Sequence, residues 1–358
     1  MNFGGLKIEP RLEPKLSWQL FSAFLALALS MIVCAIMLSA AGADVGKAFY
    51  QIYKGAFGGW NATVKTLVMS TPLILTGVAV SVAFHAKIWN IGAEGQLFAG
   101  AMLAYWASTF LSNSPTAVVI PVVIVAAFSG GALYGGLAGY LKARFAVNEV
   151  LSTVMLNYVI RYVLSFLLVS GSWRDPSSFY QQTPKVADAA HYPLLMAGSR
   201  LHLGFLIALI AALAVYFFIT RTSLGYEIRA IGYNPTAARF KGISVGRTVV
   251  IVMLISGGIA GLAGAGEVFG LHFRLKPDIS TGFGFTGIII AMLAGLHPIG
   301  VIVAAVLFGG LVNGGIRMQI FAGVPTAMIS AIEGIILLFF LTSAALTRYE
   351  IKRVKPDG

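Results

Sequence analysis

The sequence has few charged residues for its length. Lys, Arg, Asp and Glu make up 11% of its 358 residues, whereas hydrophobic residues make up 58%. A soluble domain carries about 25% charged residues, and the surface of a chain this size in water could not be covered with the number present. The scarcity of charge therefore excludes a soluble globular protein, and the shortage of polar residues also excludes a disordered chain.

Cysteine and the usual catalytic motifs are scarce as well. Cys34 is the single cysteine, so no internal disulfide can form. The five histidines lack the spacing of metal ligands, and no Gly-x-Ser-x-Gly elbow occurs. A phosphate-binding loop is also missing, because Gly46-Lys47 follows Gly42 too closely and precedes Ala48. We predict no catalytic residue, metal or cofactor in this chain, and any ATP used must bind to another subunit.

The net charge of +12 does not indicate a nucleic-acid partner. Nucleic-acid binding would favour basic stripes interleaved with aromatic residues, and the sequence has none. The basic residues lie instead between apolar runs, which is typical of a membrane protein oriented by its cytoplasmic Lys and Arg.

Most of the sequence consists of long uncharged runs, and about 20 residues suffice to cross a bilayer. They predict an all-α, polytopic membrane protein of about ten transmembrane helices, some of them short or broken. The first run is too long for the apolar part of a signal peptide, so it predicts an uncleaved helix. The predicted spans are 16–43, 66–86, two within 95–141 broken at 112–115, 150–171, 201–220, 248–270, two short helices within 279–316 hinged at 295–298, and 324–346.

Charge asymmetry predicts the orientation. An even number of spans places both termini on one side, and assigning that side to the cytoplasm puts 15 Lys and Arg residues inside against 9 outside. We therefore expect cytoplasmic tails at 1–15 and 347–358 around a single transmembrane domain, 16–346. Segments 44–65 and 172–200 would be external, the first as an amphipathic interfacial helix or an ordered loop. Segment 222–247 would be cytoplasmic.

Four ionisable residues lie within or beside apolar stretches of the sequence: Glu94, Arg161, Glu267 and Glu333. Charges are expensive in lipid, so these side chains should face a bundle interior, a polar partner or a water-filled path. Glu267 lies near the outer end of its span and could simply reach the interface. An Arg161–Glu333 ion pair with a structural role and a role in transport both stay open.

Segment Asn90–Gln96 places polar residues between two glycines and two apolar spans. This pattern favours unwound backbone at membrane depth, which is tolerated only where protein or a cavity satisfies its amides. A plain cytoplasmic turn is the alternative. The hinge at 295–298 marks a second interrupted pair of helices, an arrangement often found along substrate paths.

Segment 222–247 predicts two short basic amphipathic helices. Asn234-Pro235 is typical of a helix start, with Asn as the cap and Pro at the first position. Such helices would form a docking platform for another protein or an anchor on the membrane surface. The apolar positions with helical spacing are Leu224, Ile228, Ile231, Ala237, Ala238 and Phe240.

Four stretches resemble one known family: 84–96, 148–158, 225–243 and 284–300. They are similar to the membrane permeases of bacterial ABC importers of the branched-chain and simple-sugar type, closest to the nucleoside-type subgroup. The longer N-terminal region resembles the larger of two paired permeases. The resemblance implies a non-enzymatic subunit in the bacterial plasma membrane that transports nucleosides by alternating access. A pentose permease and a proton-coupled carrier are the alternatives.

The resemblance also implies partners and site residues. The partners are an ABC ATPase subunit, a second homologous permease forming a heterodimer, an extracytoplasmic solute-binding lipoprotein and the lipid bilayer. Arg161 departs from the family pattern, which leads us to expect an uncharged residue there. The candidate path residues are Asn90, Glu94, Gln96, Glu149, Asn157 and Glu333. The residues implied to lie in the ATPase-coupling helix are Gly225, Arg229, Ala230, Gly232, Asn234, Ala238 and Gly242.

Overall fold

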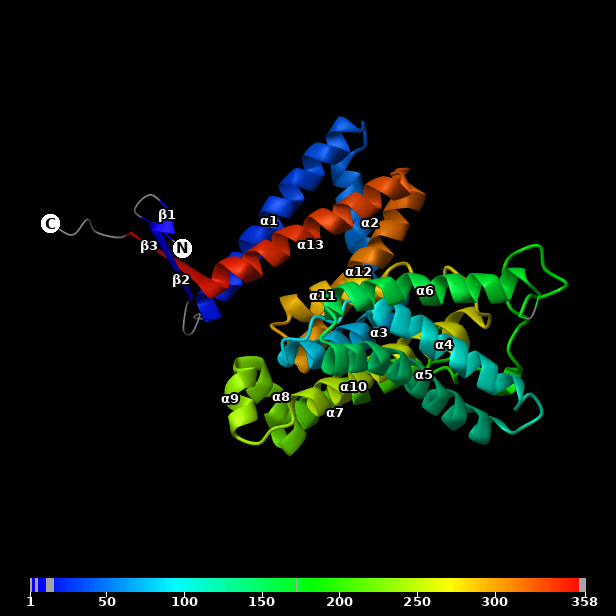
Figure 1. The fold of residues 1–358 in the computed structure, drawn as a ribbon. Coiled ribbons are helices and arrows are strands. Elements are labelled where there is room, and N and C mark those ends of the chain that lie inside the picture. Colours follow the sequence, from blue (N-terminus) through cyan, green and yellow to red (C-terminus); the bar gives the residue numbers. More distant parts are fainter. Residues whose placement is uncertain (1, 4–5, 11–15, 172, 354–358) are drawn as a thin grey trace. The chain divides into compact units, whose positions relative to one another are not determined.

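The computed structural model describes residues 2–3, 6–10, 16–171 and 173–353, and the chain forms two compact units (Figure 1). The first unit combines Met1–Gly58 with Leu311–Gly358, and the second is Gly59–Gly310. The division into one transmembrane domain and two tails stays a prediction.

The first unit is built on two long helices, α1 (Leu16–Ala40) and α13 (Thr326–Arg348), which run side by side in opposite directions (Figure 1). Its core includes Cys34 and Met318, both fully buried. Three short antiparallel strands lie beyond these helices in the order β1-β2-β3. They are β1 (Asn2–Phe3), β2 (Leu6–Pro10) and β3 (Tyr349–Arg353).

The external segment predicted at 44–65 contains a helix, α2 (Val45–Phe57). The Asp44 carboxylate caps it by accepting a hydrogen bond from the Lys47 N–H at 2.9 Å. One face of α2 is buried and includes Gln51, while Tyr53 on the other face is 65% exposed. Of the two alternatives, the amphipathic helix is therefore correct, and its position at a membrane interface stays a prediction.

The second unit is a helical bundle around α3 (Trp60–His85), α4 (Ala93–Thr109), α5 (Thr116–Phe145) and α10 (Val245–Ala265). The short helices of the 222–247 segment lie at one end of this bundle, and the segment joining α6 to α7 lies at the other (Figure 1). The remaining elements are α6 (Glu149–Val169), η1 (Asp188–Ala190), α7 (Leu203–Arg221), α8 (Ser223–Tyr233), α9 (Pro235–Phe240), the π-helix η2 (Gly266–His272), α11 (Phe283–Leu293) and α12 (Pro298–Ala322), whose C-terminal part belongs to the first unit.

Glycine allows α5 and α10 to approach closely. A Cβ at Gly131 would lie 2.1 Å from the carbonyl oxygen of Gly257, and one at Gly257 would lie 2.2 Å from that of Gly131. No side chain fits at either position, so the two backbones are in direct contact. Close packing of small residues is characteristic of helix interfaces in membranes, where helices associate without a hydrophobic driving force.

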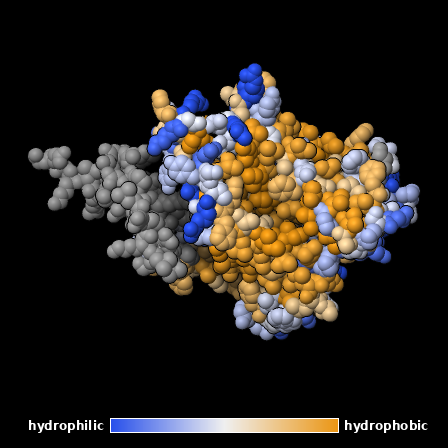
Figure 2. Space-filling view, turned by 90° about the horizontal axis from the view of Figure 1, so that it is seen from below, coloured by the Kyte–Doolittle hydropathy of each residue, from blue (hydrophilic) through white to orange (hydrophobic). Residues whose placement is uncertain are grey.

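The all-α fold class is confirmed for the transmembrane part, because each predicted span coincides with a helix. The predicted break at 112–115 separates α4 from α5. Seven described helices are long and apolar enough to cross a membrane, and residues 24–40 and α11 are shorter apolar helices. Figure 2 shows a face on which hydrophobic side chains form a broad surface with hydrophilic ones at its margins.

Helices α3 and α12 are longer than the sequence predicts. α3 begins at Trp60 rather than at 66, because the exposed Lys65 lies near the helix end, where a long side chain can extend to water. α12 runs for 25 residues and is not short. The Arg317 guanidinium donates a hydrogen bond to Gln51 of α2 at 2.9 Å, so this charge is accommodated within the helix rather than ending it.

Candidate functional site

Four of the six candidate path residues form a buried hydrogen-bond network around the connection between α3 and α4. The side-chain amides of Asn90 and Gln96 pair reciprocally, with both N–H···O distances at 3.0 Å. Asn90 also donates to the hydroxyl of Ser256 on α10 at 2.9 Å, and that hydroxyl donates to the carbonyl of Ala79 on α3 at 2.6 Å. The network thus ties three helices together at the α3–α4 connection.

Asn157 extends this network to α6. Its Nδ2 donates to the Ile91 carbonyl at 2.9 Å, and its Oδ1 accepts from the Gly95 N–H at 2.8 Å. The Thr153 hydroxyl accepts from the Ile91 N–H at 3.3 Å. Side chains thus accept hydrogen bonds from the Ile91 and Gly92 N–H groups of this non-helical connection, as buried backbone outside a helix requires.

Glu94 joins α4 to α11. Its carboxylate accepts a hydrogen bond from the Gly284 N–H at 2.8 Å, in the first turn of α11, and only 2% of the residue is exposed. A negative charge is favoured at this position because the N-terminus of a helix carries unpaired N–H groups and a partial positive charge. Glu94 therefore acts here as an intramolecular cap that connects two helices.

The remaining two candidates lie apart from this network. Glu149 begins α6, and its carboxylate lies 2.5 Å from the ammonium group of Lys142 in the last turn of α5. Glu333 lies on α13 in the first unit, beside Gly315 of α12. A role in the solute path stays a prediction for all six residues.

Sequence reasoning missed the neighbours of Arg161 on α6. Arg161 is exposed, and so are Tyr158 and Tyr162, with 53% and 72% of their surfaces accessible. These three positions lie on one helix face, because residues three and four apart are neighbours. The spacing of two tyrosines around an intramembrane arginine is the indication that the sequence offers.

The predicted helices of segment 222–247 are confirmed as α8 and α9. The Asn234 side chain caps α9 by accepting hydrogen bonds from the Thr236 and Ala237 N–H groups at 3.0 Å. A Cβ at Gly232 would lie 2.0 Å from the carbonyl oxygen of His85. The backbone of α8 therefore lies directly against the end of α3, where the connection to α4 begins.

Three of the seven residues implied to couple to an ATPase are buried, whereas Asn234 and Gly242 are exposed. Gly225, Gly232 and Ala238 are buried, and the Arg229 guanidinium donates to the Ile219 carbonyl at the end of α7. Outward-facing aromatic side chains lie beside them and were not among the predicted residues. They are Tyr233, 86% exposed, and Phe240, 89% exposed.

The segment between α6 and α7, predicted to be external, is attached to the residues that follow η2. The Asp175 carboxylate lies 2.5 Å from the Arg274 guanidinium, and the Thr183 N–H donates to the Leu275 carbonyl at 3.0 Å. Hydrogen bonds from Ser177 and the ion pair with Arg274 lower the pKa of Asp175 to about 2. The segment is thus an ordered structure over this end of the bundle.

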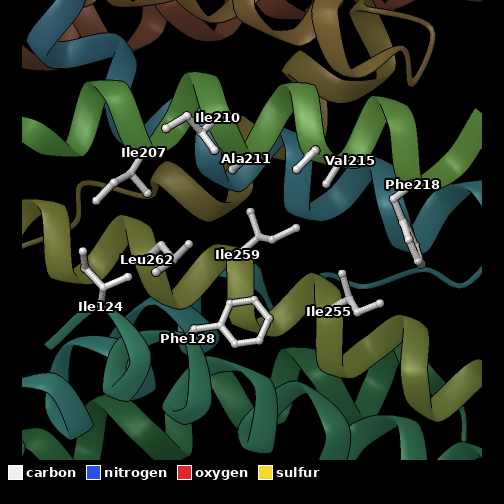
Figure 3. Close-up of a pocket in the computed structure, with 11 residues that line it drawn as sticks. Ile124, Phe128, Ile207, Ile210, Ala211, Val215, Phe218, Ile255, Ile259 and Leu262 are labelled. Carbon is white, nitrogen blue, oxygen red and sulfur yellow. The ribbon is translucent and has the colours of Figure 1, made fainter. Parts of the chain in front are cut away.

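An apolar cavity of about 450 Å³ lies between α5, α7 and α10 (Figure 3). Phe128, Ile210, Phe218 and Ile259 are among the side chains that line it, and all of the lining is apolar. It offers no polar group to a polar solute, so it is a poor candidate for the transport site. In the part of the chain that the structure describes, no group of three or more His, Cys, Asp or Glu residues could hold a metal ion.

Comparison with known families matches residues 62–341 to the model described as branched-chain amino acid transport system / permease component. The chain belongs to this permease family. The resemblance based on the four sequence stretches is thereby confirmed. The chain is a multi-pass membrane protein of this transport permease family.

Three relatives illustrate the range of solutes in this family. The guanosine ABC transporter permease NupP of Bacillus subtilis is 36% identical over 340 residues, which cover 93% of this chain and 96% of NupP. The guanosine permease NupQ of the same organism is 27% identical over 68% of this chain and 78% of NupQ. A glucose ABC transporter permease of Haloferax volcanii is 31% identical over 97% of this chain and 94% of the relative.

Proposed function

We propose that this chain is the larger permease subunit of an ATP-driven importer of nucleosides in the bacterial plasma membrane. The observation that carries the proposal is the near full-length similarity to a guanosine permease, which exceeds the similarity to the glucose permease. The buried amide network supports it by defining a rigid connection through which movement of α8 reaches the helices of the bundle.

The proposed partners follow from the two ends of the bundle. An ABC ATPase subunit docks on α8 and α9. ATP binds to that ATPase subunit, so this chain itself needs no cofactor. A second, homologous permease completes a heterodimer; the presence of two guanosine permeases in one organism, each similar to this chain, supports this arrangement. A solute-binding lipoprotein docks on the opposite, external end. Both termini are then cytoplasmic.

The mechanism is alternating access driven by the ATPase. Closure of the ATPases moves α8, which lies against His85 at the end of α3. The amides of Asn90 and Asn157 transmit that displacement to α10 and α6, and Glu94 transmits it to α11. Such a chain of hydrogen bonds converts the movement of one short helix into rocking of whole helices around a central path.

Uptake measurements on proteoliposomes containing the complete complex test the proposal. We expect guanosine to accumulate only when ATP is supplied inside, and an excess of unlabelled nucleoside to inhibit it more than an excess of glucose or a pentose. Uptake that survives ATP depletion but collapses with an uncoupler would instead indicate a proton-coupled carrier. Preferential uptake of a sugar would favour the second candidate, a simple-sugar permease, for which the glucose relative is the supporting observation.

A further inference from the structure

The exposed face of α6 carries polar groups in the middle of a membrane-spanning helix. Arg161 lies within one turn of the midpoint of α6, which runs from Glu149 to Val169. Tyr158 and Tyr162 flank it on the same face, and Phe166 continues the aromatic row one turn further, with 68% of its surface accessible. An aromatic row therefore faces away from the bundle of the second unit, and the Arg161 guanidinium lies at the edge of this row, on the side of α4.

This face is unsuited to lipid. A guanidinium group at the centre of a span is strongly disfavoured in hydrocarbon, and intramembrane arginines face protein or water-filled paths. Arg161 is also too near the helix midpoint to reach either interface easily. The face must therefore be covered by something that offers polar partners.

The surroundings of Arg161 hold it in place but leave its N–H groups available. Its guanidinium lies 5.9 Å from the ring centroid of Phe98, a fully buried residue of α4, and the Glu94 carboxylate attracts it electrostatically. Among residues 16–171 and 173–353, no hydrogen bond or ion pair to Arg161 is formed. A positioned guanidinium with free donors is suited to binding a ligand that presents two acceptors side by side.

We infer that Tyr158, Arg161 and Tyr162 form a recognition site for 6-oxopurine nucleosides on the wall of the solute path, an assignment that rests on the proposed nucleoside transport. The tyrosine rings stack on the planar base, since base–aromatic stacking is tolerant of base identity. The guanidinium donates two parallel hydrogen bonds to O6 and N7 of the purine, an edge that adenine lacks because it carries a donor at position 6. A sugar has neither the planar face nor this edge.

Competitive uptake by the complete complex in proteoliposomes tests the inference. We expect Arg161→Lys, which keeps the charge but loses the planar fork, to lower kcat/KM for guanosine and inosine about 10-fold or more, as loss of a bidentate contact implies. Adenosine uptake should change less than about 2-fold, because it does not use this contact. Tyr162→Ala removes the stacking ring and should lower the uptake of all nucleosides. Tyr162→Phe keeps the ring and should take up nucleosides as the wild type does.

Matched controls separate recognition from folding and assembly. Arg144→Lys changes an exposed arginine at the end of α5, and Tyr140→Ala removes a tyrosine with 51% of its surface accessible from the same helix; both should leave uptake unchanged. Equal loss of guanosine and adenosine uptake in Arg161→Lys, or loss of the second permease from the purified complex, would overturn the inference. If the wild-type complex takes up only sugars, the proposed function itself is contradicted. If the complex takes up guanosine and none of the α6 variants changes that uptake, this inference alone is overturned.

Discussion

At the scale of single residues, the buried amides next to α4 determine the geometry of the unwound connection. Asn90 contributes hydrogen bonds to Gln96, Ser256 and the Gly92 N–H, and none of its surface is exposed. Removing one partner from a buried network leaves the others unsatisfied, and each unsatisfied group costs about 1–3 kcal/mol. The stability of this region therefore depends on few side chains.

We predict that Asn90→Ala destabilises the protein by about 2 kcal/mol or more, because the Gln96 amide and the Gly92 N–H lose their partner. The measurement is the thermal unfolding midpoint of the purified protein in detergent. Asn113→Ala, in the exposed connection between α4 and α5, is the control and should leave the midpoint unchanged. Equal midpoints for the two variants would show that the network contributes nothing to stability.

The sequence alone indicates which of these residues are polar within apolar surroundings, but it cannot identify their partners. Ser256 is 166 residues from Asn90, and Gly284 is 190 residues from Glu94. Only the packing of α10 and α11 against α4 creates those contacts. The same limit applies to Asn157 and Arg161, which lie four residues apart on α6. The sequence does not show that Asn157 is buried and bonded to the α3–α4 connection while Arg161 is exposed.

At the scale of elements, helix limits could be predicted where charges or caps mark them. Asn234 fixes the start of α9 through a local hydrogen bond, and the gap between α4 and α5 falls at the predicted polar break. The prediction was wrong for α12, because the partner of Arg317 lies on α2, far away in sequence. Local chemistry determines short-range boundaries, whereas tertiary pairing decides whether a charge can remain inside a helix.

The exposed aromatic residues on α8 and α9 lead to a prediction about ATPase docking. Phe240→Glu should weaken association with the ATPase about 30-fold, since loss of a central aromatic anchor typically costs about 2 kcal/mol or more. Affinity is measured with the purified permeases and the isolated ATPase. Phe179→Glu, which changes a similarly exposed phenylalanine in the segment between α6 and α7, should have no effect. Undiminished binding by Phe240→Glu would remove Phe240 from the proposed interface.

The attachment of the segment between α6 and α7 leads to a prediction about pH. The pKa of Asp175 is lowered to about 2 by Ser177 and Arg274, so the ion pair stabilises this segment above about pH 4 and is lost as the pH falls toward 2. Limited proteolysis of segment 173–202 should therefore be slow from pH 7 to 5 and accelerate below pH 4.

Substitution of this carboxylate provides the test at constant pH. Asp175→Asn should make segment 173–202 several-fold more susceptible to proteolysis at pH 7 and should flatten the pH dependence. Asp278→Asn is the control, since its carboxylate is 81% exposed and lies 4.0 Å from Lys276. A wild-type profile for Asp175→Asn would show that the ion pair does not hold the segment.

For the whole molecule, the amino-acid composition is the most direct indication that this is a helical membrane protein. Few charges and long apolar runs leave a lipid-embedded helical bundle as the fold, and glycine contacts such as Gly131 with Gly257 explain how its helices pack. Charge predicts that the end of the bundle with segment 222–247 faces the cytoplasm, because this segment and the residue before it contain five Lys and Arg residues. The proposed ATPase contact requires this end to be inside.

Cysteine labelling decides the orientation, and the chain is well suited to it. Its single cysteine, Cys34, is fully buried and can be replaced by Ala. Phe179→Cys then places one thiol in the segment between α6 and α7, and Thr236→Cys places one in α9; these two segments lie at opposite ends of the second unit (Figure 1). A membrane-impermeant maleimide should label Phe179→Cys in intact cells and Thr236→Cys only after permeabilisation. If Thr236→Cys reacts in intact cells instead, α9 faces outward, no cytoplasmic ATPase can reach it, and movement of α8 cannot drive transport.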